Sequence, residues 1–145
     1  MDGTWQELFD LLEKLGKTLE QLTEISHEKT KAVMRDDLMA VNECMKKEQA
    51  ISLGLRTTDI KRTKLLEKLG IGAFPLSALP EHCPEELRLK ARQVAEYVRD
   101  QYMIYHSAAE VSRTTLEVNL HQIEKLIESE GGAPSRGGGM ADIRA

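Results

Sequence analysis

The stretch ISHEKTKAVMRDDLMAVNECMKKEQ, residues 25–49, decides the fold, because it holds the polar break between two long amphipathic runs. Apolar residues recur at helical spacing before this break and resume with the same period after it. Asp37 stands directly before Leu38, where its carboxylate can accept free backbone N–H groups and cap a helix. The chain is therefore expected to turn near Asp36 and to run back along itself.

The run before the break predicts a helix over about residues 4–35 with a heptad seam. Its apolar positions alternate spacings of three and four residues: Trp5, Leu8, Leu12, Leu15, Leu19 and Leu22. The same register continues through Ser26 and Lys29. A neighbouring line that includes Leu11 and Ile25 widens the apolar face, so this helix should touch two partners.

A second helix is expected over about residues 37–69. One apolar line of this helix comprises Leu38, Val41, Met45, Leu55, Leu66 and Leu69. Glu48 interrupts this line. In an antiparallel hairpin Glu48 comes level with Ser26 and Lys29, which predicts a polar layer of these three residues. Such a layer fixes the register of a helix pair and adds little stability, so we interpret it as structural.

A third helix is expected over about residues 84–129. Pro84 suits the first position of a helix, and no later proline or glycine interrupts the segment. At about 1.5 Å per residue it would reach roughly 70 Å, against roughly 50 Å for each arm of the hairpin. Its last turns would then overhang the bend, unless the helix kinks near Ser107 and folds back.

Composition favours one all-α domain over residues 1–130, a long antiparallel helical hairpin with a third long C-terminal helix in a three-helix coiled-coil bundle. Charged residues make up 30% of the chain and aromatic residues 4%. The formal net charge of −4 argues against nucleic-acid binding, and no stretch is apolar enough to span a membrane. Residues 131–145, with their many glycines, are expected to be a disordered tail.

The sequence offers no convincing catalytic or metal site. Glu24 and His27 form a single Glu-x-x-His pair, whereas metal-binding bundles need two such pairs and two more carboxylates. Cys44 and Cys83 are far apart and need not pair, which favours a reduced, cytoplasmic protein. We expect no enzyme activity, no cofactor and no metal.

The end of the third helix carries the strongest candidate for a binding surface. Its apolar residues are Val111, Leu116, Leu120, Ile123, Leu126 and Ile127. This stripe is core if the helix folds back or forms a homodimer. It is a docking surface if the stripe stays exposed and captures an amphipathic partner helix. The residues alone leave both readings open.

The hairpin resembles the N-terminal half of FlgN-type flagellar export chaperones. The likeness lies in residues 28–33, EKTKAV, before the bend, and in Val41 and residues 46–49, KKEQ, after it. The order of elements also agrees over roughly residues 5–130, with a hairpin, a short apolar linker and a long C-terminal helix.

This resemblance implies a cytoplasmic, non-enzymatic chaperone. Such proteins bind the C-terminal segments of the hook–filament junction proteins and deliver them to the flagellar type III export apparatus, so the export gate is a further expected partner. In that case the stripe from Val111 to Ile127 binds substrate. The alternative is a structural coiled-coil adaptor that homodimerises through its C-terminal helix, so the chain is expected to be a monomer or a homodimer.

Overall fold

The computed structural model describes residues 2–72 and 74–131, which are helical apart from short connections. The elements are α1 (Asp2–Met34), α2 (Leu38–Lys68), a 3₁₀ turn η1 (Leu76–Ala78), α3 (Leu79–His82), a 3₁₀ turn η2 (Glu85–Leu87) and α4 (Arg88–Gly131). Strands are absent from these residues, which confirms the predicted all-α class. The predicted tail lies outside the described residues from position 132 onward.

Hydrogen bonds of Asp37 close the bend between α1 and α2 on both sides. The backbone N–H of Asp37 donates to the Ala32 carbonyl at 2.9 Å, which closes the end of α1. Asp36 adopts a left-handed conformation with φ of 57°, and this reverses the chain. Asp37 Oδ1 then accepts from the Ala40 backbone N–H at 3.1 Å, so the predicted N-cap is confirmed.

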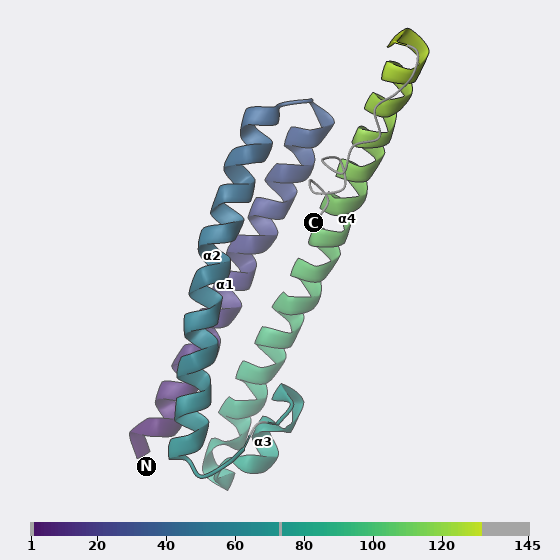
Figure 1. Ribbon diagram of the computed structural model, residues 1–145. Coiled ribbons are helices and arrows are strands. Elements are labelled where there is room, and N and C mark those ends of the chain that lie inside the picture. Colours follow the sequence, from purple (N-terminus) through teal and green to yellow (C-terminus); the bar gives the residue numbers. More distant parts are fainter. Residues whose placement is uncertain (1, 73, 132–145) are drawn as a thin grey trace.

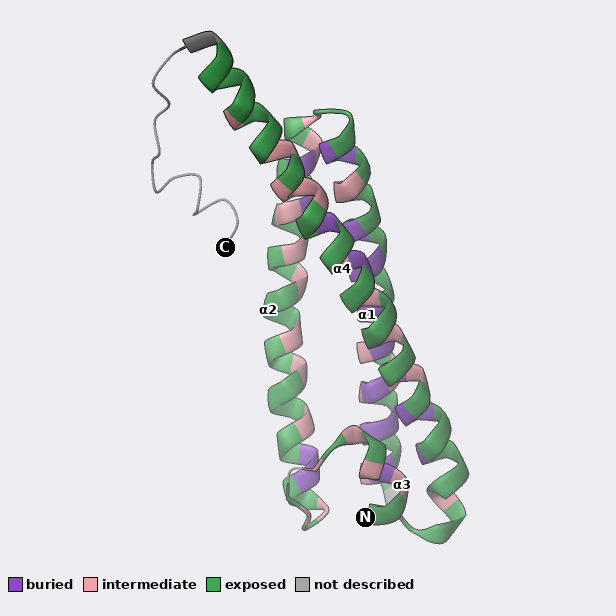
Figure 2. Ribbon diagram, turned by 90° about the vertical axis from the view of Figure 1, so that its right-hand side faces the viewer, coloured by how far each residue is buried: buried purple, intermediate pink, exposed green. Residues whose placement is uncertain are grey.

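Helix α1 lies in the middle of the molecule, with α2 along one side and α4 along another (Figure 1). The two outer helices approach each other much less closely than either approaches α1. Buried residues accordingly follow α1 along most of its length (Figure 2). The largest apolar cluster includes Trp5, Leu8, Phe9, Leu12, Leu19, Leu22, Leu65, Leu66, Leu79, Ala91, Val94 and Val98. A smaller cluster beside the bend contains Ala32, Val33 and Val41.

The connection between α2 and α4 closes the end of the hairpin opposite the bend. Leu79 of α3 is 1% exposed, and Phe74 and Leu76 pack against the main cluster. Pro84 was expected to begin the third helix, but α4 begins at Arg88. The intervening residues form η2, in which the Leu87 N–H donates to the Pro84 carbonyl at 2.9 Å.

Leu38 was expected in the buried line of α2 and is instead 76% exposed. It is the first residue of α2, so it stands at the bend, where the helix has no packed turn before it. Met39 beside it is 82% exposed. The apolar residues of α2 therefore begin one turn closer to the bend than its buried residues do.

Helix α4 is continuous from Arg88 to Gly131, so the kink near Ser107 does not occur. It runs in the same direction as α1 and continues beyond the bend (Figure 1). About halfway along α1, a methyl group at Gly16 would overlap the ring of Tyr97 of α4. Any side chain at position 16 would therefore force this ring to shift.

Candidate functional site

Helix α4 leaves the body of the protein at Asn119. Asn119 Nδ2 donates to Asp36 Oδ1 in the bend at 3.0 Å, and Leu116 packs against the small apolar cluster beside it. We call the part of α4 from Leu120 onward the overhang. At about 1.5 Å per residue these last twelve residues extend roughly 18 Å past Asn119. Figure 2 shows this segment as mainly exposed.

The overhang presents apolar side chains to solvent. Ile123 is 39% exposed, Leu126 60% and Ile127 49%, while Leu120 is half-buried. Leu116, Leu120, Ile123 and Ile127 follow one another at spacings of three and four residues, so they share one face of the helix. Nearer the N-terminus of α4, the same face of the helix packs on α1. In the overhang this face lies beyond the end of α1.

Val111 does not belong to this face. It precedes Leu120 by nine residues, which is two and a half helical turns, so the two side chains leave opposite sides of α4. Val111 is 56% exposed and shares its side with Ile104 and Val118, which are 50% and 53% exposed. The structure therefore separates Val111 from Leu116, Leu120, Ile123 and Ile127, while Leu126 lies between the two sides.

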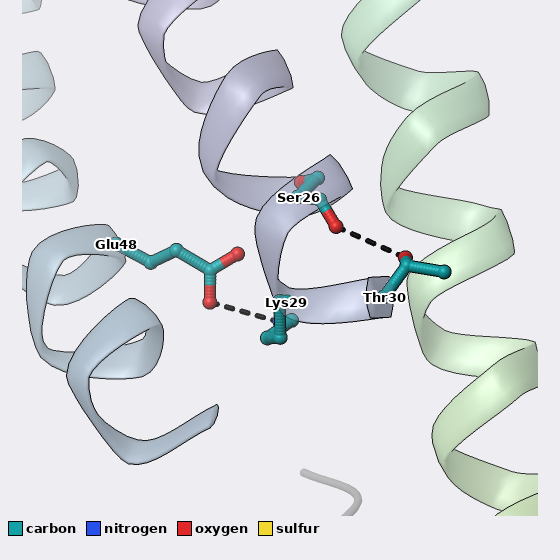
Figure 3. A network of polar contacts seen from close by, with 4 residues as sticks. All are labelled: Ser26, Lys29, Thr30 and Glu48. Atoms are coloured by element: carbon teal, nitrogen blue, oxygen red, sulfur yellow. Dashed lines mark hydrogen bonds and ion pairs between the residues drawn. The ribbon is translucent and has the colours of Figure 1, made fainter. Parts of the chain in front are cut away.

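Of the three residues of the predicted polar layer, the structure brings two together. Lys29 Nζ donates to Glu48 Oε1 at 2.9 Å across α1 and α2 (Figure 3), and both side chains are about one-fifth exposed. Ser26 takes no part in this pair. Its Oγ is buried without a hydrogen-bond partner, and its carbonyl accepts from Thr30 Oγ1 at 3.0 Å.

Tyr105 of α4 lies near the same ion pair. Burial raises the pKa of its phenol, and the negative charge of Glu48 raises it further. The sequence gave no indication of this polar neighbour. The layer thus reaches from α2 across α1 toward α4, through Glu48 rather than through Ser26.

A groove between α2 and α4 was not predicted from the sequence. It has a volume of about 670 Å³. Its floor is formed by Leu11, Leu12, Leu15 and Leu19 of α1, and its end by Leu76, Ser77 and Pro80. The walls carry Leu55, Thr58, Asp59 and Arg62 from α2 and Arg92, Ala95, Glu96, Val98, Arg99 and Tyr102 from α4. The groove exists because α2 and α4 both pack on α1 and approach each other much less closely.

The two cysteines are poor nucleophiles. Both are buried and free, and burial raises the pKa of each thiol. Thiols with raised pKa values stay protonated near neutral pH and react slowly. Cys83 Sγ donates to the Pro80 carbonyl at 3.4 Å, which holds it in the connection to α4.

Glu24 and His27 are both exposed on α1. Within residues 2–72 and 74–131, no three side chains of the His, Cys, Asp or Glu type gather where they could hold a metal ion. None of the helices in this part of the chain combines the length and apolar character of a membrane span.

The comparison with known families agrees with the resemblance found in the sequence. The model of the family described as FlgN protein matches residues 1–138, which is nearly the whole chain. Neither the curated proteins nor the solved structures gave a match. On the strength of the family match, the chain belongs to the FlgN family of flagellar export chaperones.

Proposed function

We propose that this protein is a cytoplasmic, non-enzymatic chaperone that captures the C-terminal helical segments of the hook–filament junction proteins and delivers them to the flagellar type III export apparatus. Membership of the FlgN family supports the class of function. The observation that carries the proposal is the overhang, an apolar helix face that the other described residues, 2–72 and 74–119, leave uncovered.

The overhang suits an amphipathic helix as its ligand. Leu120, Ile123 and Ile127 form an apolar stripe that a second helix can cover with residues of its own at spacings of three and four. The bend offers further apolar surface nearby, because Met34 and Leu38 are 73% and 76% exposed. A bound segment would in this way be shielded from premature association until export.

The test compares two aspartate substitutions in the full-length protein. Binding to peptides from the C-terminal ends of the junction proteins is measured by calorimetry for Ile123→Asp and for Leu89→Asp. Leu89 is a matched control, because it is an apolar residue on the same helix and 64% exposed, but far from the overhang.

We expect Ile123→Asp to weaken peptide binding at least about tenfold, since it places a charge in the apolar contact. Leu89→Asp should bind like the wild type. Equal binding by both variants, each with wild-type helicity, would remove the overhang as the capture surface.

A structural adaptor that dimerises through α4 is the second candidate. The side of α4 that carries Ile104, Val111 and Val118 at seven-residue spacing favours it, because such spacing is typical of a coiled-coil seam. Val111→Asp separates the two functions. Loss of self-association with intact peptide binding would assign this side to an adaptor contact and leave capture to the overhang.

A further inference from the structure

One side of α2 between residues 50 and 68 is exposed along its whole length. At 3.6 residues per turn, every residue of this segment that lies within about 60° of one line along the helix is exposed. We call this set the outer face of α2. Its members are Ala50, Leu53, Gly54, Thr57, Ile60, Lys61, Lys64 and Lys68. At about 1.5 Å per residue the outer face is roughly 27 Å long.

The first half of the outer face resembles a helix-packing surface. Leu53 and Ile60 are 65% and 58% exposed and stand seven residues apart, which is the spacing of a coiled-coil seam. The residues beside them on this face, Ala50, Gly54 and Thr57, are small, so a second helix could come close to the backbone of α2. No other element among residues 2–72 and 74–131 covers this surface.

Gly54 is a further sign of a partner at this face. Glycine in the interior of a helix destabilises it relative to alanine, unless something must approach the backbone closely. A methyl group at Gly16 would overlap the ring of Tyr97, whereas one at Gly54 would have no neighbour within 4 Å. Packing among the described residues therefore accounts for Gly16 but not for Gly54.

The second half of the outer face is basic. Helix α2 has seven lysines and arginines against four acidic residues, a net charge of +3 in a chain of net charge −4. The charged members of the outer face are Lys61, Lys64 and Lys68, and the nearest carboxylate, that of Glu67, leaves the helix about 80° from the centre of the face.

These three lysines have no ion pair among residues 2–72 and 74–131. Arg62, on another side of α2, is paired with Asp59 at 2.7 Å. The positive charge of the outer face is therefore available to a partner that brings carboxylates.

From the apolar seam, the small residues and the unpaired lysines we propose that the outer face of α2 binds an acidic amphipathic helix of a protein partner. Apolar side chains of that helix cover Leu53 and Ile60, and its carboxylates meet the lysines one to two turns further along α2. A protein helix fits better than an anionic membrane, because a helix that inserts into lipid presents a broad apolar side, often with aromatic residues, and this seam is narrow and has none.

The outer face is separate from the overhang. It lies on the half of α2 that leads away from the bend, whereas the overhang continues α4 beyond the bend (Figure 1). Both surfaces can therefore be occupied at once. If the overhang carries an export substrate, a step that rests on the proposed function, the outer face lets a second protein hold the loaded chaperone.

The experiment uses a synthetic helical peptide as the probe. It has about 20 residues, to match the length of the face, with leucine at the apolar heptad positions and glutamate beside them. A control peptide carries lysine in place of each glutamate. Binding to the full-length protein is measured by fluorescence anisotropy for the wild type, Lys64→Glu, Gly54→Gln and Lys17→Glu. Lys17 is a matched control, because it is an exposed lysine on α1.

We expect the acidic probe to bind the wild type and Lys17→Glu equally, and Lys64→Glu at least about tenfold more weakly. Binding should weaken in high salt, because exposed charges are screened, and the lysine peptide should not bind. Gly54→Gln should weaken binding at least about fivefold while raising the urea midpoint, since glutamine favours the helix and its side chain blocks close approach. Damage to the fold would instead lower that midpoint.

Failure of the acidic probe to bind, or equal binding by Lys64→Glu and Lys17→Glu, would overturn the proposal. Loss of probe binding in Ile123→Asp would do the same, because the probe would then lie on the overhang. Self-association of the wild type that Lys64→Glu abolishes would give the face to a second copy, and binding to phosphatidylserine vesicles that Lys64→Glu abolishes would give it to a membrane. None of these results depends on the junction peptides, so the proposed function is tested separately.

Discussion

The two ends of α4 carry the same kind of sequence and have opposite surroundings. Toward its N-terminus, Ala91, Val94 and Val98 are 0%, 3% and 4% exposed against α1, whereas Ile123 and Ile127 near its C-terminus are 39% and 49% exposed. Both sets recur at helical spacing. The difference lies in the reach of α1, which ends at the bend while α4 continues. An amphipathic period thus predicts that a helix has a partner, but not which molecule supplies it.

The sharpest way to test this comparison is to place a charge at each end. Val98→Asp should cost about 3–5 kcal/mol of stability, because it puts a carboxylate among buried apolar side chains. Ile123→Asp should change the free energy of unfolding by less than about 0.5 kcal/mol. Urea unfolding at a protein concentration that keeps the chain monomeric measures both. A large loss of stability in Ile123→Asp would mean that the overhang is part of the core.

A second pair of substitutions tests the tight contact between α1 and α4. Gly16→Ala should destabilise the protein by about 1 kcal/mol, because the displaced ring of Tyr97 loses packing that outweighs the helix propensity gained. Gly54→Ala, in α2 with open space around it, should stabilise by about 0.5–1 kcal/mol. Opposite shifts of the urea midpoint are expected. Shifts of the same sign would show that Tyr97 moves aside without loss.

Much of the packed part of this fold could be predicted from the sequence. The spacing of the leucines reports the buried face of α1 directly, and the carboxylate before Leu38 indicates the cap at Asp37. Phe9 was missed, although it is fully buried, because it lies off the heptad seam on the side that meets a second neighbour. The groove was missed because periodicity gives faces and not distances between helices.

The separation of Val111 from the overhang face has a geometric cause. A strict seven-residue repeat drifts by about 20° per heptad on a straight helix, so a long buried line must insert an extra step of four. On α4 the buried line passes from Ala108 to Ser112 rather than to Val111, and Ser112 is 1% exposed. The sequence favoured the valine because it is apolar, while the helix geometry places the serine inside.

Ser112 marks an intermediate region between the two ends of α4, where small residues face α1. Its Oγ is buried without a hydrogen-bond partner. Ser112→Ala should stabilise the protein by about 1 kcal/mol, because it removes an unsatisfied hydroxyl and favours the helix. Ser107→Ala, at an exposed position on α4, should gain only the helix propensity of about 0.5 kcal/mol. Equal gains in the thermal unfolding of both variants would indicate that the Ser112 hydroxyl finds a partner in solution.

The smallest expected effect concerns Tyr105, which lies where the packed part of α4 approaches the Lys29–Glu48 pair. Because burial and the Glu48 charge raise the pKa of Tyr105 in the folded state, the folded protein holds this proton more tightly than the unfolded chain does. The contribution of the protonated Tyr105 phenol to the free energy of unfolding is therefore complete below the usual tyrosine pKa of about 10. It is lost as the pH rises through the pKa of Tyr105 in the folded protein.

Stability should therefore fall less steeply above about pH 10 in Tyr105→Phe than in the wild type, as measured by urea unfolding across that range. Glu48→Gln should reduce the slope only in part, because burial is the larger of the two causes. A slope that Tyr105→Phe leaves unchanged would mean that the Tyr105 ring is well solvated, unlike Ala108 and Ser112, which are buried further along α4. The contact between α4 and the Lys29–Glu48 pair would then contribute nothing to stability at high pH.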